Sequence, residues 1–273
     1  MTEEDLVRLA KLEAITIDPV TLTSLPASYL EPLCRLRQLR RLAIVRSFVG
    51  LPACIGELKD MQHLDVRGNH FTTAAAMPES MNQLTNLVEF IAFGQHTYTY
   101  QGPNSPCTNM SCVPNTAVLS MDVDDQKDVE NQESPRWRCG SLKADLEDLP
   151  IWRWSKLEKF WVDMNHLSFK EPASFFDRVV EAWPRLRTLD LYDNDIEVDI
   201  AHVKKLKKLP HLHQLLLQNN RVYGQVDGCN GTFFADWPPS WQDLDIRLNK
   251  GIGSCVNHHE IPKYLNFNWE LPN

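Results

Sequence analysis

The chain has 273 residues, with 28 basic and 36 acidic side chains and a formal net charge of −8 at pH 7. It has no stretch of about 18 apolar residues, so we expect no membrane insertion. Its basic stretches are too short to neutralise a nucleic-acid backbone, which excludes nucleic acid as a partner.

The N-terminal residues Thr2-Glu-Glu-Asp5 fit a capping box that would open a short helix. They lack the basic and apolar regions of a signal peptide. The pattern L-x-x-L-x-L-x-x-N-x-L then returns eight times, beginning at Leu12, Leu39, Met61, Leu87, Leu157, Leu186, Leu212 and Trp241.

Such repetition indicates units that cannot bury their apolar residues alone and must stack into one solenoid domain over 1–273. Each copy predicts a short strand with inward-facing leucines. We expect these strands near residues 12–17, 39–44, 61–66, 87–92, 157–162, 186–191, 212–217 and 241–246. Ile261–Leu265 resembles the start of another return segment, so a further repeat is expected at Leu271.

The segments between strands also share a template. Residues 51–61 and 77–87 both fit L-P-x-x-h-x-x-L-x-x-L, where h is apolar, which predicts a helical turn on the outer side of the solenoid. Phe175–Trp183 and Ile200–Leu209 are expected to form fuller α-helices.

The strand motif and this return template resemble those of leucine-rich repeat (LRR) proteins, with return segments similar to the plant type. The resemblance implies an α/β solenoid: a curved horseshoe with a parallel concave β-sheet and a convex side of mixed helical and irregular segments. It also implies that the asparagine of each repeat bonds backbone groups of the neighbouring coil. These asparagines are Asn69, Asn165, Asn194, Asn220 and Asn249. Val20, Ser47 and Gln95 occupy this position in the other repeats, which predicts looser coils there.

The rhythm breaks between Tyr98 and Leu149, so we expect an acidic, cysteine-containing insertion over 98–149. Within it, acids at calcium-loop spacing make a weak calcium candidate, comprising Asp122, Asp124, Asp128 and Glu133. Lys127 occupies the position where that loop requires glycine, so a solvated loop is favoured and we expect no metal.

The seven cysteines suggest how the chain is processed. Cys107 can pair with Cys112, and Cys229 with Cys255, whereas Cys34 and Cys54 are expected to be buried thiols. Two glycosylation acceptor sequences begin at Asn109 and Asn230. Together these features favour slightly an extracellular or luminal protein, with a cytoplasmic one as the alternative.

Side chains that flank the buried leucines point to the concave face of an LRR sheet. There the sequence predicts an apolar middle with polar groups around it, and Trp161 is the first candidate for a binding hot spot. The candidate partner-binding residues are Arg67, Ile91, Phe93, Trp161, Asp163, Met164, Asp190, Tyr192, Asp193, Leu216, Asp245 and Arg247.

The sequence carries no nucleophile elbow, phosphate-binding loop or dinucleotide fingerprint, so we expect no enzyme and no cofactor. The favoured hypothesis is a module that binds a protein or peptide on the concave face. The alternative is a structural subunit of a larger complex that makes contact through its insertion and convex side. Glycan recognition is a third, weaker option.

Overall fold

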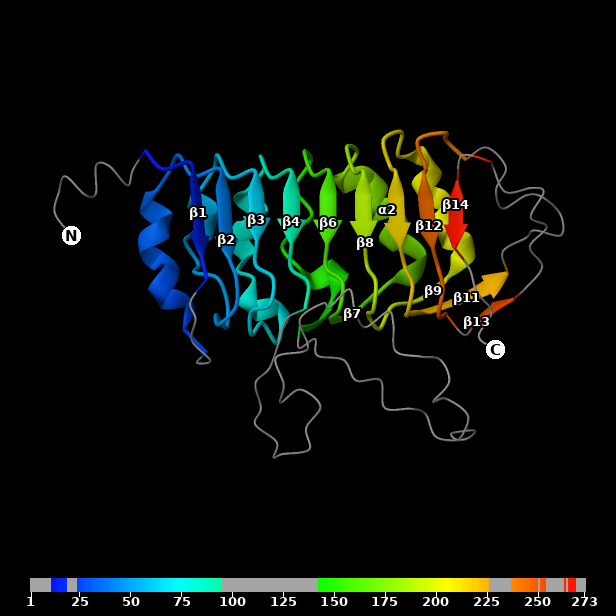
Figure 1. Cartoon of the computed structure of the whole chain (residues 1–273), viewed down its shortest axis with the longest axis horizontal. Coiled ribbons are helices and arrows are strands. Elements are labelled where there is room, and N and C mark those ends of the chain that lie inside the picture. The colour runs from blue at the N-terminus through cyan, green and yellow to red at the C-terminus, as the bar shows by residue number, and fades with distance from the viewer. Residues whose placement is uncertain are drawn as a thin grey trace, which may run out of the picture.

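The computed structural model describes residues 11–18, 24–94, 142–225, 237–249, 251–253, 263 and 265–268. In these residues nine short strands form one parallel sheet, and Figure 1 shows them side by side with the helices of the return segments behind. In spatial order they are β1 (Ala14–Ile17), β2 (Arg41–Ile44), β3 (His63–Asp65), β4 (Glu89–Ile91), β6 (Lys159–Trp161), β8 (Thr188–Asp190), β10 (Gln214–Leu216), β12 (Asp243–Asp245) and β14 (Asn266–Asn268).

The sheet has one side toward the core and one side away from it. The second residue of each strand from β2 to β12 is buried, as Leu42, Phe160 and Leu244 illustrate. Its two neighbours point to the opposite side, because side chains alternate along a strand. We call that opposite side the concave face. The first eight strands lie within the expected segments, and the sheet is the open parallel sheet of an α/β solenoid.

The long interruption leaves the main sheet unbroken. Strand β4 pairs directly with β6, with Ile91 opposite Trp161. Across the same junction the Trp154 indole Nε1 donates to the Met81 carbonyl oxygen at 2.9 Å. Aromatic packing adds to this contact, because the ring centroids of Phe90 and Trp154 lie 5.1 Å apart.

The interruption is shorter than expected at its C-terminal end. Residues 142–149 were assigned to it, but they form β5 (Lys143–Asp145) and the 3₁₀-helix η8 (Leu146–Asp148). Strand β5 pairs with β7 (His166–Ser168), and Leu142, Leu146 and Leu149 are buried. These residues belong to the solenoid because their leucines complete its core.

The asparagine ladder is formed as expected. The buried Asn194 amide donates to the carbonyl oxygens of Val162 and Leu191, both at 3.1 Å, and its Oδ1 accepts from the Leu167 backbone N–H. Asn69, Asn165, Asn220 and Asn249 make equivalent bonds. The side chains of these asparagines therefore satisfy buried backbone groups between coils.

The return segments are mostly short 3₁₀-helices, with a single α-helix in the described residues, α2 (Pro172–Ala182). The 3₁₀-helices are η1 (Ala27–Arg35), η2 (Ile55–Glu57), η3 (Ala74–Ala76), η4 (Glu79–Gln83), η8 and η9 (Ile200–Lys208). The expectation of an α-helix over 200–209 was therefore wrong. Buried Ile200, Val203 and Leu206 recur at every third residue, which suits the three-residue turn of a 3₁₀-helix.

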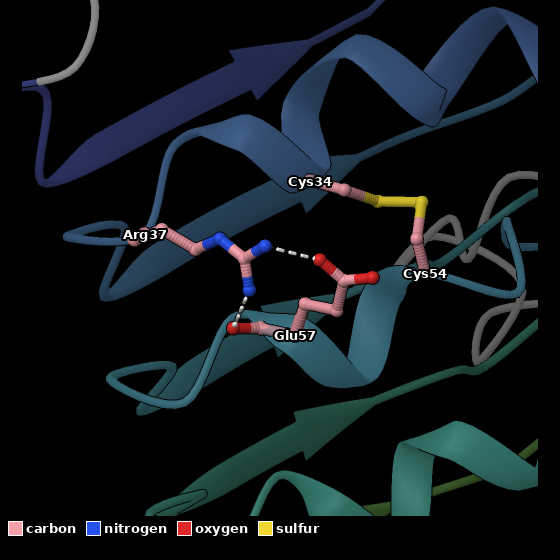
Figure 2. The surroundings of a disulfide bond; sticks show 4 residues. All are labelled: Cys34, Arg37, Cys54 and Glu57. Carbon is pink, nitrogen blue, oxygen red and sulfur yellow. Dashed lines mark hydrogen bonds and ion pairs between the residues drawn. A yellow bond between two sulfur atoms is a disulfide. The ribbon is translucent and has the colours of Figure 1, made fainter.

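A disulfide corrects another expectation (Figure 2). Cys34 on η1 and Cys54 just before η2 are bonded, with their Cα atoms 5.8 Å apart, so they are not free thiols. They are 20 residues apart, close to the step between the repeats at Leu39 and Met61. Stacking therefore brings them together. Beside them Arg37 forms an ion pair with Glu57 and donates to its carbonyl oxygen.

A second parallel sheet, absent from the expectations, lies at the C-terminal end below the main strands (Figure 1). It contains β9 (Glu197–Asp199), β11 (Arg221–Gln225) and β13 (Gly251–Gly253). The ninth main strand begins at Asn266 and pairs with β12. The last repeat therefore starts earlier than the expected position at Leu271.

Candidate interaction surface on the concave face

Three columns of side chains cross the concave face, because the strands are parallel and in register. The first column is made by the first residue of each strand and includes Arg41, His63, Glu89, Lys159, Thr188 and Gln214. The central column is made by the third residue and includes Ala43, Asp65, Ile91, Trp161, Asp190, Leu216 and Asp245. The third column lies two residues further along and contains Arg67, Phe93, Asp163, Tyr192, Gln218 and Arg247.

The expected aromatic residues meet in the middle of this face. Ile91 and Trp161 are neighbours in the central column, and Phe93 and Tyr192 lie in the third column, all half-buried. The Lys159 ammonium lies 5.6 Å from the Trp161 ring centroid. The indole Nε1 of Trp161 is shielded from solvent and has no hydrogen-bond partner among the described residues. The Trp161 ring therefore carries a buried donor with no acceptor among these residues.

An acidic group adjoins the aromatic residues. Burial raises the pKa of Asp163 to about 8, and repulsion from Asp190 and, less strongly, Asp193 adds to the shift. Burial also raises the pKa of Asp190 to about 6. The Tyr192 backbone N–H donates to the Asp190 carboxylate at 3.1 Å and lowers this pKa, but by less than burial raises it. Repulsion from Asp245 adds to this second shift. On this face, therefore, the negative charges of the Asp163 and Asp190 carboxylates are not balanced by nearby positive charge.

Two of the acids expected at an exposed polar rim are instead buried. Asp245 is 4% exposed, because Arg247 donates to its carboxylate from the backbone N–H, Nε and Nη2, the last at 2.7 Å. Asp193 is 9% exposed and accepts from the Asn219 amide at 2.6 Å. These contacts could not be inferred from repeat positions, since they depend on which neighbour reaches across the coil.

The remaining candidates lie at the edges of this group. Leu216 is half-buried between Asp190 and Asp245 in the central column. Met164 has a φ of 54° in the turn after β6, and its side chain is also half-buried. Arg67 binds Asp65 through Nε at 2.9 Å, and its guanidinium carbon lies 5.5 Å from the Phe93 ring centroid.

Several sequence candidates lie outside the described residues. They are the glycosylation candidates Asn109 and Asn230, the cysteines Cys107, Cys112, Cys229 and Cys255, and the calcium candidates Asp122, Asp124, Asp128 and Glu133. The capping box near Thr2 and the ladder positions Val20 and Gln95 are outside them too. Within the described ranges no cluster of three or more His, Cys, Asp or Glu side chains is arranged to hold a metal ion.

No helix in the described ranges is long and apolar enough to cross a membrane.

Comparison with known proteins supports the fold and leaves the sequence family open. No protein-family model matches the sequence, and comparison with curated proteins finds no relative.

Three solved structures with the same fold are similar to this chain at low sequence identity. One is the LRR ectodomain of the Arabidopsis thaliana membrane receptor kinase GASSHO1/SCHENGEN3, in complex with CASPARIAN STRIP INTEGRITY FACTOR 2. Its TM-score is 0.57 at 17% identity, covering 96% of this chain and 24% of that chain. An LRR protein of Leptospira interrogans has a TM-score of 0.55 at 18% identity, covering 98% of this chain and 56% of that chain. An internalin of Listeria monocytogenes has a TM-score of 0.52 at 17% identity, covering 100% of this chain and 64% of that chain.

This chain therefore spans between about a quarter and two thirds of the length of these structures. The repeat pattern, the open parallel sheet, the asparagine ladder and these similarities agree with one another. The chain has the fold of the leucine-rich repeat proteins.

Proposed function

We propose that this protein is a non-catalytic interaction module that binds a protein or peptide on its concave face, around Trp161, Tyr192 and Phe93. The observation that carries the proposal is the half-buried aromatic group in the middle of an open sheet. Aromatic side chains on a rigid backbone bury much area at a small cost in conformational entropy, and tryptophan and tyrosine dominate measured interface energies.

The acidic group favours a partner with a basic residue next to its apolar contact. Asp163 and Asp190 have no ion pair with any described residue, and both carboxyl groups hold protons more tightly than usual, with pKa values raised to about 8 and about 6. A lysine or arginine of the partner would supply the missing positive charge. Affinity for such a partner should rise as pH increases from 6 to 8, because the carboxyl groups must lose their protons to attract a cation.

The fold comparison supports the proposal by analogy alone. The Arabidopsis receptor ectodomain was solved in complex with CASPARIAN STRIP INTEGRITY FACTOR 2, and another similar structure, at 18% identity and a TM-score of 0.53, is that of PEPR1-AtPEP1. A fold does not determine a function, so the argument depends on the residues of the face.

The experiment is a matched pair of aromatic truncations. Peptides are selected from a random display library on the wild-type protein, and the affinities of the enriched sequences are measured by calorimetry for Trp161→Ala and Tyr29→Ala. Tyr29 is 70% exposed on the convex segment η1 and serves as the control. We expect Trp161→Ala to weaken binding by about 2 kcal/mol or more and Tyr29→Ala to leave it unchanged. Unchanged affinity in Trp161→Ala would refute the proposal.

The structural-subunit alternative has one observation in its favour. A depression of about 360 Å³ on the convex side is lined by Trp152, Arg178 and their neighbours. The Arg178 guanidinium carbon lies 4.1 Å from the Trp152 ring centroid, so part of this aromatic surface is already covered. We therefore rank this face second.

A further inference from the structure

The concave face has a second hollow, at its N-terminal end over β1 to β4. It has a volume of about 430 Å³ and reaches from β1 to Ile91 of β4, the strand next to that of Trp161. Figure 1 shows these strands at the blue-to-cyan end of the array. None of the candidate residues around Trp161 except Ile91 lines it.

Small side chains create this hollow. Ala14 and Thr16 of β1 and Ala43 of β2 occupy positions that carry Lys159 and Trp161 on β6. The missing volume exposes the sheet surface beside them. Larger side chains rise around it, namely Arg41, His63, Asp65, Glu89 and Ile91.

The acids at the edge of the hollow already have partners. Asp65 is bound by Arg67, with Nη2 to Oδ2 at 2.5 Å. Glu89 accepts from His63 Nδ1 at 2.8 Å, and Lys159 lies 3.5 Å from its other oxygen. Neither carboxylate is therefore available to attract a cation from a ligand without losing an internal contact.

Arg41 differs from these groups. Its side chain is exposed and makes no hydrogen bond or ion pair with any described residue. Its neighbours in the first column are Ala14 and His63, neither of which is an acid. The uncompensated charge of the hollow is therefore positive and lies beside an apolar surface. A guanidinium group in such a position is suited to bidentate binding of a carboxylate.

We propose that this hollow is a second subsite, which binds an aspartate or glutamate side chain of an extended peptide through Arg41. The residue next to that acid packs an apolar side chain on Ala43 and Ile91. The inference deepens the proposed function, because it assumes that the concave face binds a peptide, and it adds an acidic residue to the partner's chemistry.

The sheet order also gives a spacing for the two subsites. Strands β2 and β6 are three steps apart, and adjacent strands lie about 4.8 Å apart. Arg41 and Trp161 are thus separated by roughly 14 Å across the strands and, because they lie in different columns, by about 7 Å along them, which is about 16 Å in all. About five extended residues span this distance at about 3.3 Å each. A peptide that uses both subsites carries its acid about five residues from the group that contacts Trp161.

The test uses two capped tripeptides that differ only in charge, acetyl-leucyl-glutamyl-alanine amide and its glutamine counterpart. Each is titrated to millimolar concentration into ¹⁵N-labelled protein, and amide shifts are followed by NMR. We expect saturable shifts in β1, β2 and β3 with the glutamate peptide, and binding at least about tenfold weaker with the glutamine peptide. Arg41→Gln should remove this preference.

Arg40→Gln is the matched control, because Arg40 precedes Arg41, is exposed and forms a long pair with Glu13 at 3.6 Å outside the hollow. It should retain the preference for glutamate. Equal binding of the two peptides, no saturable shift at β1 to β3, or full binding by Arg41→Gln overturns the subsite. The proposed function is tested separately, since Trp161→Ala should leave glutamate-peptide binding intact.

Discussion

At the residue scale, Asp163 makes the stability of the folded protein depend on pH. Its pKa is raised from 3.8 to about 8, so the folded protein retains a proton that the unfolded chain releases above about pH 4. The free energy of unfolding should therefore fall as pH rises from about 4 to about 8, because the folded state binds more protons over that range.

Asp163→Asn removes this dependence at one site. We expect the variant to match the wild type near pH 4 and to exceed it at pH 8, with an upper bound of about 5–6 kcal/mol, since the pKa is raised by about four units and each unit corresponds to about 1.4 kcal/mol. Urea denaturation at both pH values measures the difference. The exposed Asp60 gives the control Asp60→Asn, which should follow the wild type. A gain for Asp163→Asn that is equal at both pH values would contradict the explanation.

Substitution of Asn194 tests how much the asparagine ladder contributes to stability. Its amide nitrogen donates to the carbonyl oxygens of Val162, Leu191 and Tyr192, each of which also accepts from a second donor. Its Oδ1 accepts from the buried Leu167 backbone N–H. We expect Asn194→Ala to lose about 2 kcal/mol or more in the free energy of unfolding, because the Leu167 N–H would lose this acceptor at a cost of about 1–3 kcal/mol and the bonds to the carbonyl oxygens would be lost as well. Asn82, whose amide makes only a 3.4 Å exposed contact with Glu79, provides the control. Similar losses in Asn82→Ala and Asn194→Ala would argue against the ladder's role.

Single positions on the concave face were predictable only in part. The repeat register placed Trp161, Tyr192 and Phe93 on this face because alternation along a strand is a local property. The burial of Asp193 and Asp245 was not predictable, because it depends on Asn219 and Arg247 reaching particular carboxylate oxygens. Arg41 was missed as well, since its importance comes from small neighbours on two other strands.

At the scale of elements, the disulfide joins two return segments at the N-terminal end of the array. Cys34 and Cys54 close a loop of 20 residues between η1 and η2. In the first repeats Val20 and Ser47 stand where later repeats have asparagine, so this covalent link ties coils that lack the usual amide bonds.

The double variant Cys34→Ala/Cys54→Ala should lose about 3 kcal/mol in the free energy of unfolding, because a disulfide of this loop length restricts the unfolded chain by about that amount. Denaturant titration under non-reducing conditions measures the loss. Peptide mapping without reduction should recover the Cys34 and Cys54 peptides as one species. Alkylation of both as free thiols in natively sourced protein would contradict the bond.

The elements themselves show what the sequence pattern determines. Strands could be predicted because each has an inward leucine or aromatic residue at a fixed repeat position, as in Leu157–Val162. The second sheet was missed, although Ile196 and Val198 alternate with polar residues and indicate a strand. In η9 the three-residue apolar spacing was assigned to an α-helix because the two helix types share i, i+3 contacts.

At the scale of the whole molecule, one open sheet presents an aromatic and acidic centre at Trp161, with a smaller basic hollow at Arg41 toward its N-terminal end. The opposite side carries the return helices, with Tyr29 and Trp152 among its aromatic residues. A partner bound as we propose covers the first of these surfaces, whereas a structural subunit would be covered on the second.

The measurement that tests this claim most directly is hydroxyl-radical footprinting of the protein with its partner copurified from the native source. Reactive side chains lie on both sides, with Trp161, Tyr192, Phe93 and Met164 on the concave face and Tyr29 and Trp152 on the convex side. We predict that the partner protects the concave group and leaves Tyr29 and Trp152 as reactive as in the free protein. Protection confined to the convex side would contradict the account.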